Sequence, residues 1–369
     1  MRAKFNFNEK PEKFDYTPKS KNDLITVLFV VTNKCTHKCK FCIEDVQNNY
    51  EYEQELNPKE FLNIVDQITE CGAREIILSG GEPLLRKDFK QIVKRIKDNG
   101  MRAIICTNGY YLDEELVDFL EEVKLDTIQI SVNSLNKEIY NNLCNPPEDG
   151  YDRMLKSIDL VKKKFSGRVI LSSVPLKANK HTLIDIMRLC KEKGFERFSL
   201  FKPAPVGSAE KNSELILSEE EYIELLDELI QEFVRLGGKE VFIEQPYARY
   251  SKLAKKYGDI LHFDYICIAG FHYFSITPDG HIVPCASMSH MKELYKGDLR
   301  KEPLKKIWED NDRWRLFRTE NECKNSCEYF KICRGGCRLM SYLATGNVLA
   351  EDPLCKLWIG NIRKNSIKI

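Results

Sequence analysis

The sequence lacks the features of a membrane, secreted or nucleic-acid-binding protein. No apolar run approaches the length of about eighteen residues that a membrane-spanning helix requires, and the polar first 23 residues contain no signal-peptide core. The net charge is only +1, from 57 basic and 56 acidic residues, and no long block of one sign occurs. Neither nucleic acid nor a membrane is therefore an expected partner. We expect a cytoplasmic protein, and 369 residues favour two domains over one.

Cysteine, by contrast, is abundant. Fourteen cysteines in a reducing compartment are poor candidates for disulfide bonds, so metal binding is their leading explanation. Cys35, Cys39 and Cys42 follow the apolar run 24–31 with C-x3-C-x2-C spacing, which predicts a buried strand with chemistry at its C-terminal end. Three thiolates can hold one face of a [4Fe–4S] cluster and leave its fourth iron open. A zinc site would need a fourth ligand, such as His37.

Residues 57–206 alternate strand and helix patterns at the pace of βα units. This alternation implies a parallel sheet with helices outside it and ligands at the C-terminal ends of its strands. A later helix starts with a capping box at Ser218 and Glu221. The expected strands are 24–31, 75–78, 102–107, 127–132, 168–174 and 197–201, and the expected helices are 58–71, 88–99, 113–123, 151–164, 182–193 and 219–236.

Two strand ends carry candidate binding residues. The second strand ends in Ser-Gly-Gly-Glu-Pro-Leu, where Gly80 and Gly81 allow close backbone approach to a ligand and Glu82 adds an acceptor. Plain turn chemistry would explain the same residues. The fourth strand ends in Ser131 and Asn133, which either bind a ligand or are simply small polar residues at a strand end.

A second group of cysteines begins after residue 266. Two short strand patterns, 273–277 and 281–283, flank a Pro-Asp-Gly turn and predict a hairpin, and a helical stretch follows around 301–318. Four thiols within residues 323–337 indicate a metal site, with a zinc ribbon as the alternative to iron and sulfur. The group comprises Cys267, Cys285, Cys323, Cys327, Cys333, Cys337 and Cys355.

The other four cysteines of the chain lie in no ligand spacing. They are expected to act as small buried hydrophobes. Cys144 is the exception, because its Asn- and Pro-rich loop could bring a thiol to the mouth of the barrel as a hydrogen-atom donor. The four are Cys71, Cys106, Cys144 and Cys190.

Together these motifs resemble the radical S-adenosylmethionine (radical SAM) enzymes that carry a C-terminal SPASM extension for auxiliary iron–sulfur clusters. The resemblance rests on the C-x3-C-x-F-C loop, the GGEP turn and the later C-x12-G-x4-C and C-x3-C-x5-C-x3-C-x17-C patterns. It implies an α/β fold, namely a partial (β/α)6 TIM-like barrel followed by a small cysteine-rich domain with a β-hairpin and helices. The implied divisions are an N-terminal extension (1–23), the barrel (24–237), a linker (238–266) and the SPASM domain (267–369).

The resemblance also implies a set of cofactor sites. Cys35, Cys39 and Cys42 would hold the cluster whose open iron binds SAM, and one electron would split SAM into methionine and a 5′-deoxyadenosyl radical. Two auxiliary [4Fe–4S] clusters would bring the total to three. The first would be held by Cys267, Cys285 and Cys337, and the second by Cys323, Cys327, Cys333 and Cys355. The implied SAM-binding residues are Phe41, which could equally be a core residue, and Gly80, Gly81, Glu82, Ser131 and Asn133.

The first auxiliary set lacks a fourth ligand. Relatives that complete it carry a cysteine where this chain has Tyr273, so His272, Asp279 or a substrate could fill the gap. No catalytic side chain is assigned beyond the hydrogen-donor hypothesis for Cys144.

The expected activity is that of an anaerobic radical SAM enzyme that abstracts hydrogen from a substrate. A ribosomally made peptide, modified by cross-linking, thioether formation or epimerisation, is the first choice. A tetrapyrrole or another small molecule is the second, and sulfatase-type residue oxidation, which the missing ligand argues against, is the third. A ferredoxin or flavodoxin-type protein is the expected electron donor. An iron–sulfur electron carrier is the non-enzymatic alternative, and the paired cofactor motifs argue against it.

Overall fold

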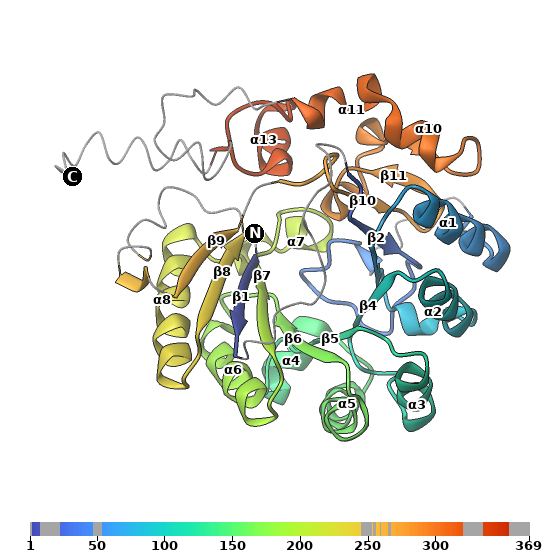
Figure 1. Cartoon of the computed structure of the whole chain (residues 1–369). Coiled ribbons are helices and arrows are strands. Elements are labelled where there is room, and N and C mark those ends of the chain that lie inside the picture. Colours follow the sequence, from blue (N-terminus) through green and yellow to red (C-terminus); the bar gives the residue numbers. More distant parts are fainter. Residues whose placement is uncertain are drawn as a thin grey trace.

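The computed structural model describes residues 2–7, 23–46, 54–244, 253, 256–258, 260–264, 267–319 and 335–353. Within these ranges, twelve strands form one sheet in the order β12-β11-β10-β2-β3-β4-β5-β6-β7-β1-β8-β9 (Figure 1). The strands are β1 (Arg2–Asn6), β2 (Thr26–Val30), β3 (Glu75–Ser79), β4 (Arg102–Thr107), β5 (Thr127–Ser131), β6 (Arg168–Ser173), β7 (Arg197–Phe201), β8 (Glu240–Glu244), β9 (Leu261–Asp264), β10 (Tyr273–Ile276), β11 (His281–Val283) and β12 (Gly297–Asp298).

The centre of the sheet is the predicted parallel barrel. Strands β2 to β7 pair in sequence order and all run parallel, so their C-terminal ends meet at one edge. Helices cover the outside of this barrel, as the alternation of patterns predicts (Figure 1). The helices are α1 (Pro58–Glu70), α2 (Phe89–Asp98), α3 (Glu114–Glu122), α4 (Lys137–Cys144), α5 (Gly150–Lys164), α6 (Leu183–Glu192), α7 (Ser208–Lys211), α8 (Glu219–Arg235), α10 (Leu304–Glu309), α11 (Asn311–Arg318) and α13 (Arg338–Thr345).

Two helices, α1 and α8, begin at capping boxes. The Asn57 side chain accepts from the backbone N–H of Lys59 and Glu60, and the Glu60 carboxylate accepts from the Asn57 N–H, which forms a capping box at α1. The predicted box at Ser218 and Glu221 starts α8 in the same way. These local bonds satisfy N–H groups that have no partner inside a helix.

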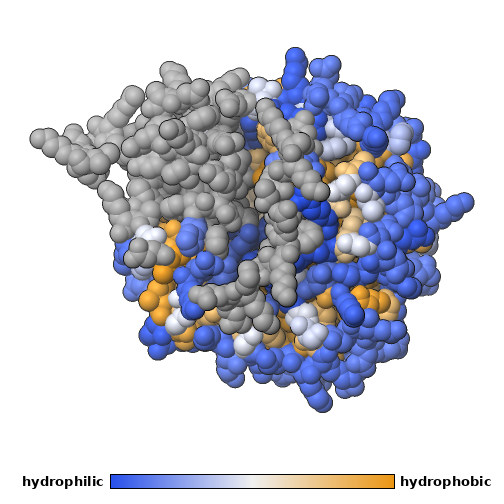
Figure 2. Space-filling model, viewed as in Figure 1, coloured by the Kyte–Doolittle hydropathy of each residue, from blue (hydrophilic) through white to orange (hydrophobic). Residues whose placement is uncertain are grey.

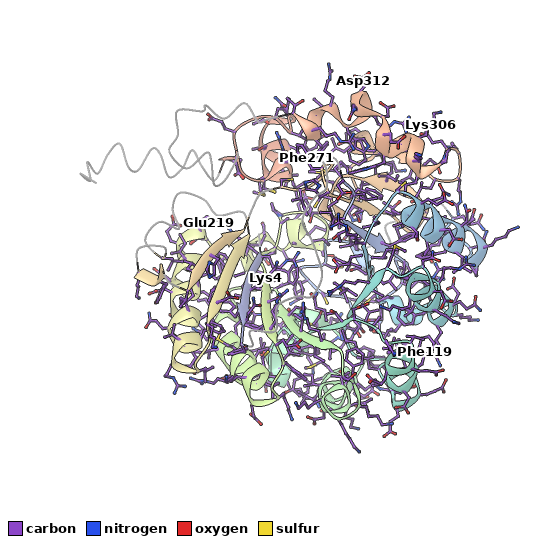
Figure 3. The ribbon with its side chains drawn as sticks, viewed as in Figure 1. Lys4, Phe119, Glu219, Phe271, Lys306 and Asp312 are labelled. Carbon is purple, nitrogen blue, oxygen red and sulfur yellow. The ribbon has the colours of Figure 1, made fainter. Side chains whose placement is uncertain are left out.

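Strand β1 closes one side of the barrel. It pairs antiparallel with both β7 and β8, and its residues alternate in exposure. Phe5 is fully buried between Phe198 and Phe233 on the helix-covered face. Lys4 therefore lies on the opposite face of β1, which lines the barrel interior (Figure 3). The residues expected to form an extension and a linker thus contribute β1, β8 and β9 to the sheet.

The predicted hairpin is β10–β11, and it extends the barrel sheet. Strand β10 runs parallel to β2, with Tyr273 beside Thr26, and pairs antiparallel with β11. The expected helical stretch consists of two helices, α10 and α11, whose Trp308 and Trp314 pack on Phe274. This cluster of aromatic side chains packs α10 and α11 against the sheet.

The outer surface is mainly hydrophilic over the helices, with hydrophobic side chains visible between them (Figure 2). Among the described helices, none combines the length and the apolar character that crossing a membrane requires.

Candidate active site

The first predicted ligand set lies at the C-terminal edge of the barrel. Residues 32–42, here called the cysteine loop, follow β2 and dock on the end of α4. The N–H of Lys38 donates to the Cys144 carbonyl (3.1 Å), and that of Lys40 donates to the Leu143 carbonyl (3.0 Å). Carbonyls in the last turn of a helix have no partner within it, so α4 offers acceptors that the cysteine loop uses. Asn145 ends the helix in the left-handed conformation, with φ of 40°.

The two glycines of the GGE turn allow it to pack directly on the cysteine loop. The N–H of Gly81 donates to the Thr32 carbonyl, and that of Glu82 donates to the Lys34 carbonyl, both at 2.8 Å. A Cβ atom on Gly81 would stand 2.2 Å from the Lys34 oxygen, and one on Gly80 would stand 2.5 Å from the Thr32 oxygen. Any larger residue would push the two loops apart, so glycine is required at both positions.

Glu82 is fully buried and partly bonded. Its Oε1 accepts from the Thr107 hydroxyl (2.8 Å) and the Leu84 N–H (3.2 Å), and its Oε2 accepts from the Asn108 N–H (2.8 Å). A carboxylate offers about four acceptor positions, so one position remains for a ligand. Burial raises the pKa of Glu82 to about 7, and the three donors oppose this rise.

His37 lies in a buried polar network rather than among the thiols. The Asn108 side chain stands 3.0 Å from its Nδ1, and the Tyr140 hydroxyl stands 3.0 Å from its Nε2. Burial lowers the pKa of His37 to about 4, so the ring is neutral at physiological pH. Both ring nitrogens are thus engaged, and His37 is not placed to complete a zinc site with the three cysteines.

The three thiols of the loop fit an iron–sulfur cluster. Burial raises the pKa of Cys42 to about 12 and holds the pKa of Cys35 well above its usual range. A bound cation is needed to stabilise three buried thiolates, and iron supplies one. Among the described residues, no group of three His, Cys, Asp or Glu side chains is close enough to share a single metal ion.

The other expected SAM-binding residues have different environments. Phe41 is buried and belongs to the hydrophobic core beside the loop, whereas Ser131 is partly exposed at the end of β5. The Asn133 amide is used internally, because it donates to the Cys144 sulfur (3.5 Å) and accepts from the Val174 N–H (2.9 Å). The roles of all three in binding SAM remain predictions.

Cys144 is the last residue of α4, not a residue of a loop at the barrel mouth. Its side chain is 1% exposed and faces Cys39, whose sulfur lies 3.6 Å from the Cys144 carbonyl. The role of Cys144 as a hydrogen-atom donor stays a prediction. The Cys144 carbonyl holds the cysteine loop, because it accepts from the Lys38 N–H and from the Cys39 thiol.

The second ligand set is gathered beside the start of β10. Burial raises the pKa of Cys267, Cys285 and Cys337, and a neighbouring thiol of the set raises each of them further. The Cys337 N–H donates to the Asp352 carboxylate at 2.8 Å, which fixes the start of α13. The expected second auxiliary set, Cys323, Cys327, Cys333 and Cys355, lies outside the described residues.

Tyr273 lies near one thiol of this set, Cys285. Ser275 pairs with Val283, so antiparallel register places Tyr273 opposite Cys285. Burial raises the pKa of Tyr273, and the Cys285 thiol adds to the effect. Asp279 lies at the far end of the hairpin, where it accepts from Thr277. His272 Nδ1 donates to the Asp23 carbonyl (2.8 Å).

Sequence reasoning missed a polar row on the inner face of the barrel. In the sheet register, Ser131 pairs with Ser172, Ser172 with Ser199, and Ser199 with Lys4. Paired residues point to the same face, so three hydroxyls and one ammonium form a row inside the barrel. We call these four residues the lumen row. Its members come from four different strands, β5, β6, β7 and β1, which is why periodicity within one strand could not reveal it.

Arg2 adds a second cation to this interior. Its guanidinium lies 4.8 Å from the centre of the Phe201 ring, and it pairs with Phe201 across β1 and β7. Burial raises the pKa of the Cys106 thiol to about 12, and Arg2 partly opposes this rise. Arg2 thus links the lumen row to the strands on the other side of the barrel.

Comparison with known proteins agrees with this geometry. The sequence model of the radical SAM superfamily matches residues 29–190, and that of the SPASM iron–sulfur cluster-binding domain matches residues 267–338. The AdoMet-dependent heme synthase of Methanosarcina barkeri is 27% identical over 312 residues, covering 82% of this chain and 87% of that protein. The PqqA peptide cyclase of Rhizobium meliloti is 24% identical over 344 residues, covering 90% of this chain and 86% of that protein.

A solved structure shows the same fold. SuiB of Streptococcus suis, bound to the precursor peptide SuiA, superposes with a TM-score of 0.73 at 18% identity, covering 91% of this chain and 76% of that chain. The fold, the cysteine loop and the GGE turn define a radical SAM enzyme. The chain belongs to the SPASM group of that superfamily, whose domains bind SAM and iron–sulfur clusters.

Proposed function

We propose that the chain holds a [4Fe–4S] cluster on Cys35, Cys39 and Cys42 and binds SAM against Glu82. The observation that carries this proposal is the direct docking of the GGE turn on the cysteine loop, through Gly81 to Thr32 and Glu82 to Lys34. This contact supports the proposal because it packs the turn that carries a buried carboxylate, with one remaining acceptor position, against the loop that carries the three cysteines. The ammonium of SAM is a suitable donor for that position.

The cluster and SAM, when bound, supply a 5′-deoxyadenosyl radical that abstracts hydrogen from a substrate. The chain's own residues then have three tasks. Glu82 orients the amino group of SAM, the core around Phe41 excludes water from the loop, and the lumen row faces the space inside the barrel. The substrate binds against that row, because the radical must reach it without meeting solvent.

We further propose three [4Fe–4S] clusters in total. The thiols of Cys267, Cys285 and Cys337 support a separate cluster, because each affects the pKa of the next. The third cluster is proposed on Cys323, Cys327 and Cys333, which lie within the SPASM match, and on Cys355, which follows it in the sequence.

For the substrate, a tetrapyrrole with carboxylate side chains is our first candidate. The relatives named heme synthase match across most of both chains, and the lumen row and Arg2 bring two cations and three hydroxyls into the barrel. Cations and hydroxyls bind carboxylates well, whereas an apolar barrel core would not. An anionic small molecule is therefore compatible with the interior.

A peptide is the second candidate, and a separate observation favours it. The PqqA peptide cyclase matches 90% of this chain, and precursor peptide binding is recorded for SuiB. A peptide with acidic side chains would use the same interior cations.

The experiment follows hydrogen transfer from the substrate. Anaerobically reconstituted, reduced enzyme is incubated with SAM and an iron porphyrin deuterated on its propionate side chains, and 5′-deoxyadenosine is analysed by mass spectrometry. Deuterium in the 5′-deoxyadenosine supports the first candidate. Formation of 5′-deoxyadenosine without deuterium contradicts the porphyrin substrate but not the radical SAM activity. No 5′-deoxyadenosine under any condition contradicts the proposed function itself.

A further inference from the structure

Asn108 joins the SAM side and the cluster side of the candidate active site. Its backbone N–H donates to Glu82 Oε2 at 2.8 Å. Its side-chain nitrogen lies 3.7 Å from the Cys35 sulfur and 3.0 Å from His37 Nδ1. Asn108, which follows β4, therefore contacts three residues of the site: Glu82, proposed to bind SAM, Cys35, proposed to bind the cluster, and His37.

The orientation of the Asn108 amide is fixed by the backbone. Its Oδ1 accepts from the Tyr110 N–H at 2.9 Å, so the side-chain nitrogen, with its two hydrogens, faces the cysteine loop. The Asn108 nitrogen lies 3.0 Å from His37 Nδ1 and 3.2 Å from the Thr36 hydroxyl, which itself lies 2.9 Å from Nδ1. We assign Nδ1 as the acceptor nitrogen of the ring, because the Asn108 nitrogen can only donate. His37 Nε2 accordingly carries the proton and donates to the Tyr140 hydroxyl at 3.0 Å.

The Cys35 sulfur receives two N–H groups in this arrangement. The backbone N–H of His37 donates to it at 3.4 Å, and the Asn108 amide approaches it at 3.7 Å. Hydrogen bonds to cluster sulfurs stabilise the extra negative charge of the reduced cluster and raise its reduction potential. The backbone donor persists in any variant, so only the Asn108 contribution can be altered by mutation.

We infer that Asn108 is a positioning residue of the radical-generating cluster, which donates a hydrogen bond to the Cys35 thiolate and sets the tautomer of His37. This inference rests on the proposed function, because it requires a cluster on the cysteine loop. The backbone bond to Glu82 couples the position of this donor to the SAM-binding carboxylate. Asn108 thereby makes the cluster easier to reduce.

The test compares reduction potentials rather than activity. Asn108→Leu keeps the branched shape of the side chain and removes the donor, and Asn108→Asp places an acceptor and a negative charge toward the sulfur. The midpoint potential is measured by redox titration with electron paramagnetic resonance, on the signal that changes when SAM is added. We expect a shift to more negative potential in Asn108→Leu and a larger shift in Asn108→Asp, at unchanged iron content.

The matched control is Asn142→Leu, on the exposed side of α4. Its amide also contacts the cysteine loop, but it accepts from the Lys40 ammonium (2.6 Å) rather than donating to a thiolate. This variant should keep the wild-type potential. If Asn108→Leu loses iron, the smaller Asn108→Ala, which also lacks a donor, is measured in its place. Unchanged midpoint potential in an Asn108 variant with full iron content overturns the inference, whereas a wild-type protein with no SAM-responsive cluster overturns the proposed function.

Discussion

At the scale of single residues, Glu82 determines how the protein should respond to pH. Its pKa is raised to about 7 by burial, from an ordinary value near 4.5. Between pH 4.5 and pH 7, the Glu82 carboxyl therefore stays protonated in the folded, cofactor-free protein but is ionised in the unfolded chain. This proton contributes about 3 kcal/mol to the free energy of unfolding. The contribution is fully present below about pH 4.5 and is lost as the pH rises through 7.

The same shift predicts pH-dependent binding of SAM. The cofactor ammonium needs the ionised carboxylate, and Glu82 is mostly protonated at pH 6 in the cofactor-free site. We expect the dissociation constant for SAM to rise by about tenfold from pH 8 to pH 6. Equilibrium binding of SAM to the reconstituted enzyme, measured across this range, tests the expectation.

Glu82→Gln provides the control for this prediction. The amide keeps the shape of the side chain but cannot ionise, so SAM should bind more weakly at every pH and the dependence on pH should disappear. A variant that keeps the wild-type pH dependence would show that another group is responsible.

Tyr273 offers a second test at the residue scale. It lies opposite Cys285, at the position where fully ligated relatives carry another cysteine. Tyr273→Cys should supply a fourth thiolate, and the first auxiliary cluster should then lose iron more slowly to a chelator under anaerobic conditions. Iron retained over time is the measurement. Tyr273→Phe is the control and should not slow the loss, and equal rates in Tyr273→Cys and wild type would argue against the proposed ligand set.

At the scale of elements, the packing of the GGE turn on the cysteine loop is the most sensitive contact. Gly81→Ala would bring a methyl group to 2.2 Å from the Lys34 oxygen, a contact that only backbone movement can relieve. We expect loss of the loop cluster, and therefore of about one third of the iron if three clusters are present. Iron analysis of the reconstituted variant measures this loss.

Gly72→Ala distinguishes this clash from the general cost of replacing a glycine. Gly72 has φ of 81°, and a Cβ added there would meet no atom within 4 Å, so alanine costs only backbone strain, about 1 kcal/mol. Iron content should stay at the wild-type level in this variant. Equal iron loss in both variants would show that the close contact is not the cause.

Several elements could be predicted because their patterns are local. The six parallel strands are short apolar runs, and α1 and α8 begin at capping boxes. Strand β1 could not be recognised, because Arg2 and Lys4 alternate with only two apolar residues in a five-residue segment. Helix α4 contains two consecutive asparagines, which are weak helix formers, and packing of its Tyr140 and Leu143 stabilises it instead.

The candidate site also contains residues that the sequence predicts and contacts that it does not. The cysteines and Glu82 stand in motifs that a single stretch of sequence reveals. The network of Asn108, His37 and Tyr140 joins residues that are 71 and 103 positions apart, so no local pattern contains it. Contacts of this kind depend on the register of strands and the docking of loops, which only the folded chain defines.

At the scale of the whole molecule, one sheet connects the two described ligand sets. Strand β10 pairs with β2 from Tyr273 beside Thr26 onward, so the auxiliary thiols lie near the start of β2. The cysteine loop follows the opposite end of β2. A five-residue strand is about 16 Å long, so the two sets are separated by roughly the length of this strand. We therefore expect separate clusters rather than one shared site.

This separation gives the final prediction. Wild-type protein reconstituted anaerobically should bind about twelve irons per chain, with a matching amount of sulfide. Replacing Cys35, Cys39 and Cys42 with alanine should leave about two thirds of that iron and abolish formation of 5′-deoxyadenosine, because only the loop cluster binds SAM.

The contacts of the loop explain why the other sites should survive this triple replacement. The loop is held by backbone bonds to Gly81, Glu82 and the end of α4, none of which involves a cysteine side chain, and the hairpin is held by backbone pairing to β2. Iron, sulfide and 5′-deoxyadenosine are measured on the same preparations. Stoichiometric zinc in place of iron, or 5′-deoxyadenosine formed by the triple variant at the wild-type rate, would contradict the assignment of the radical-generating cluster to this loop.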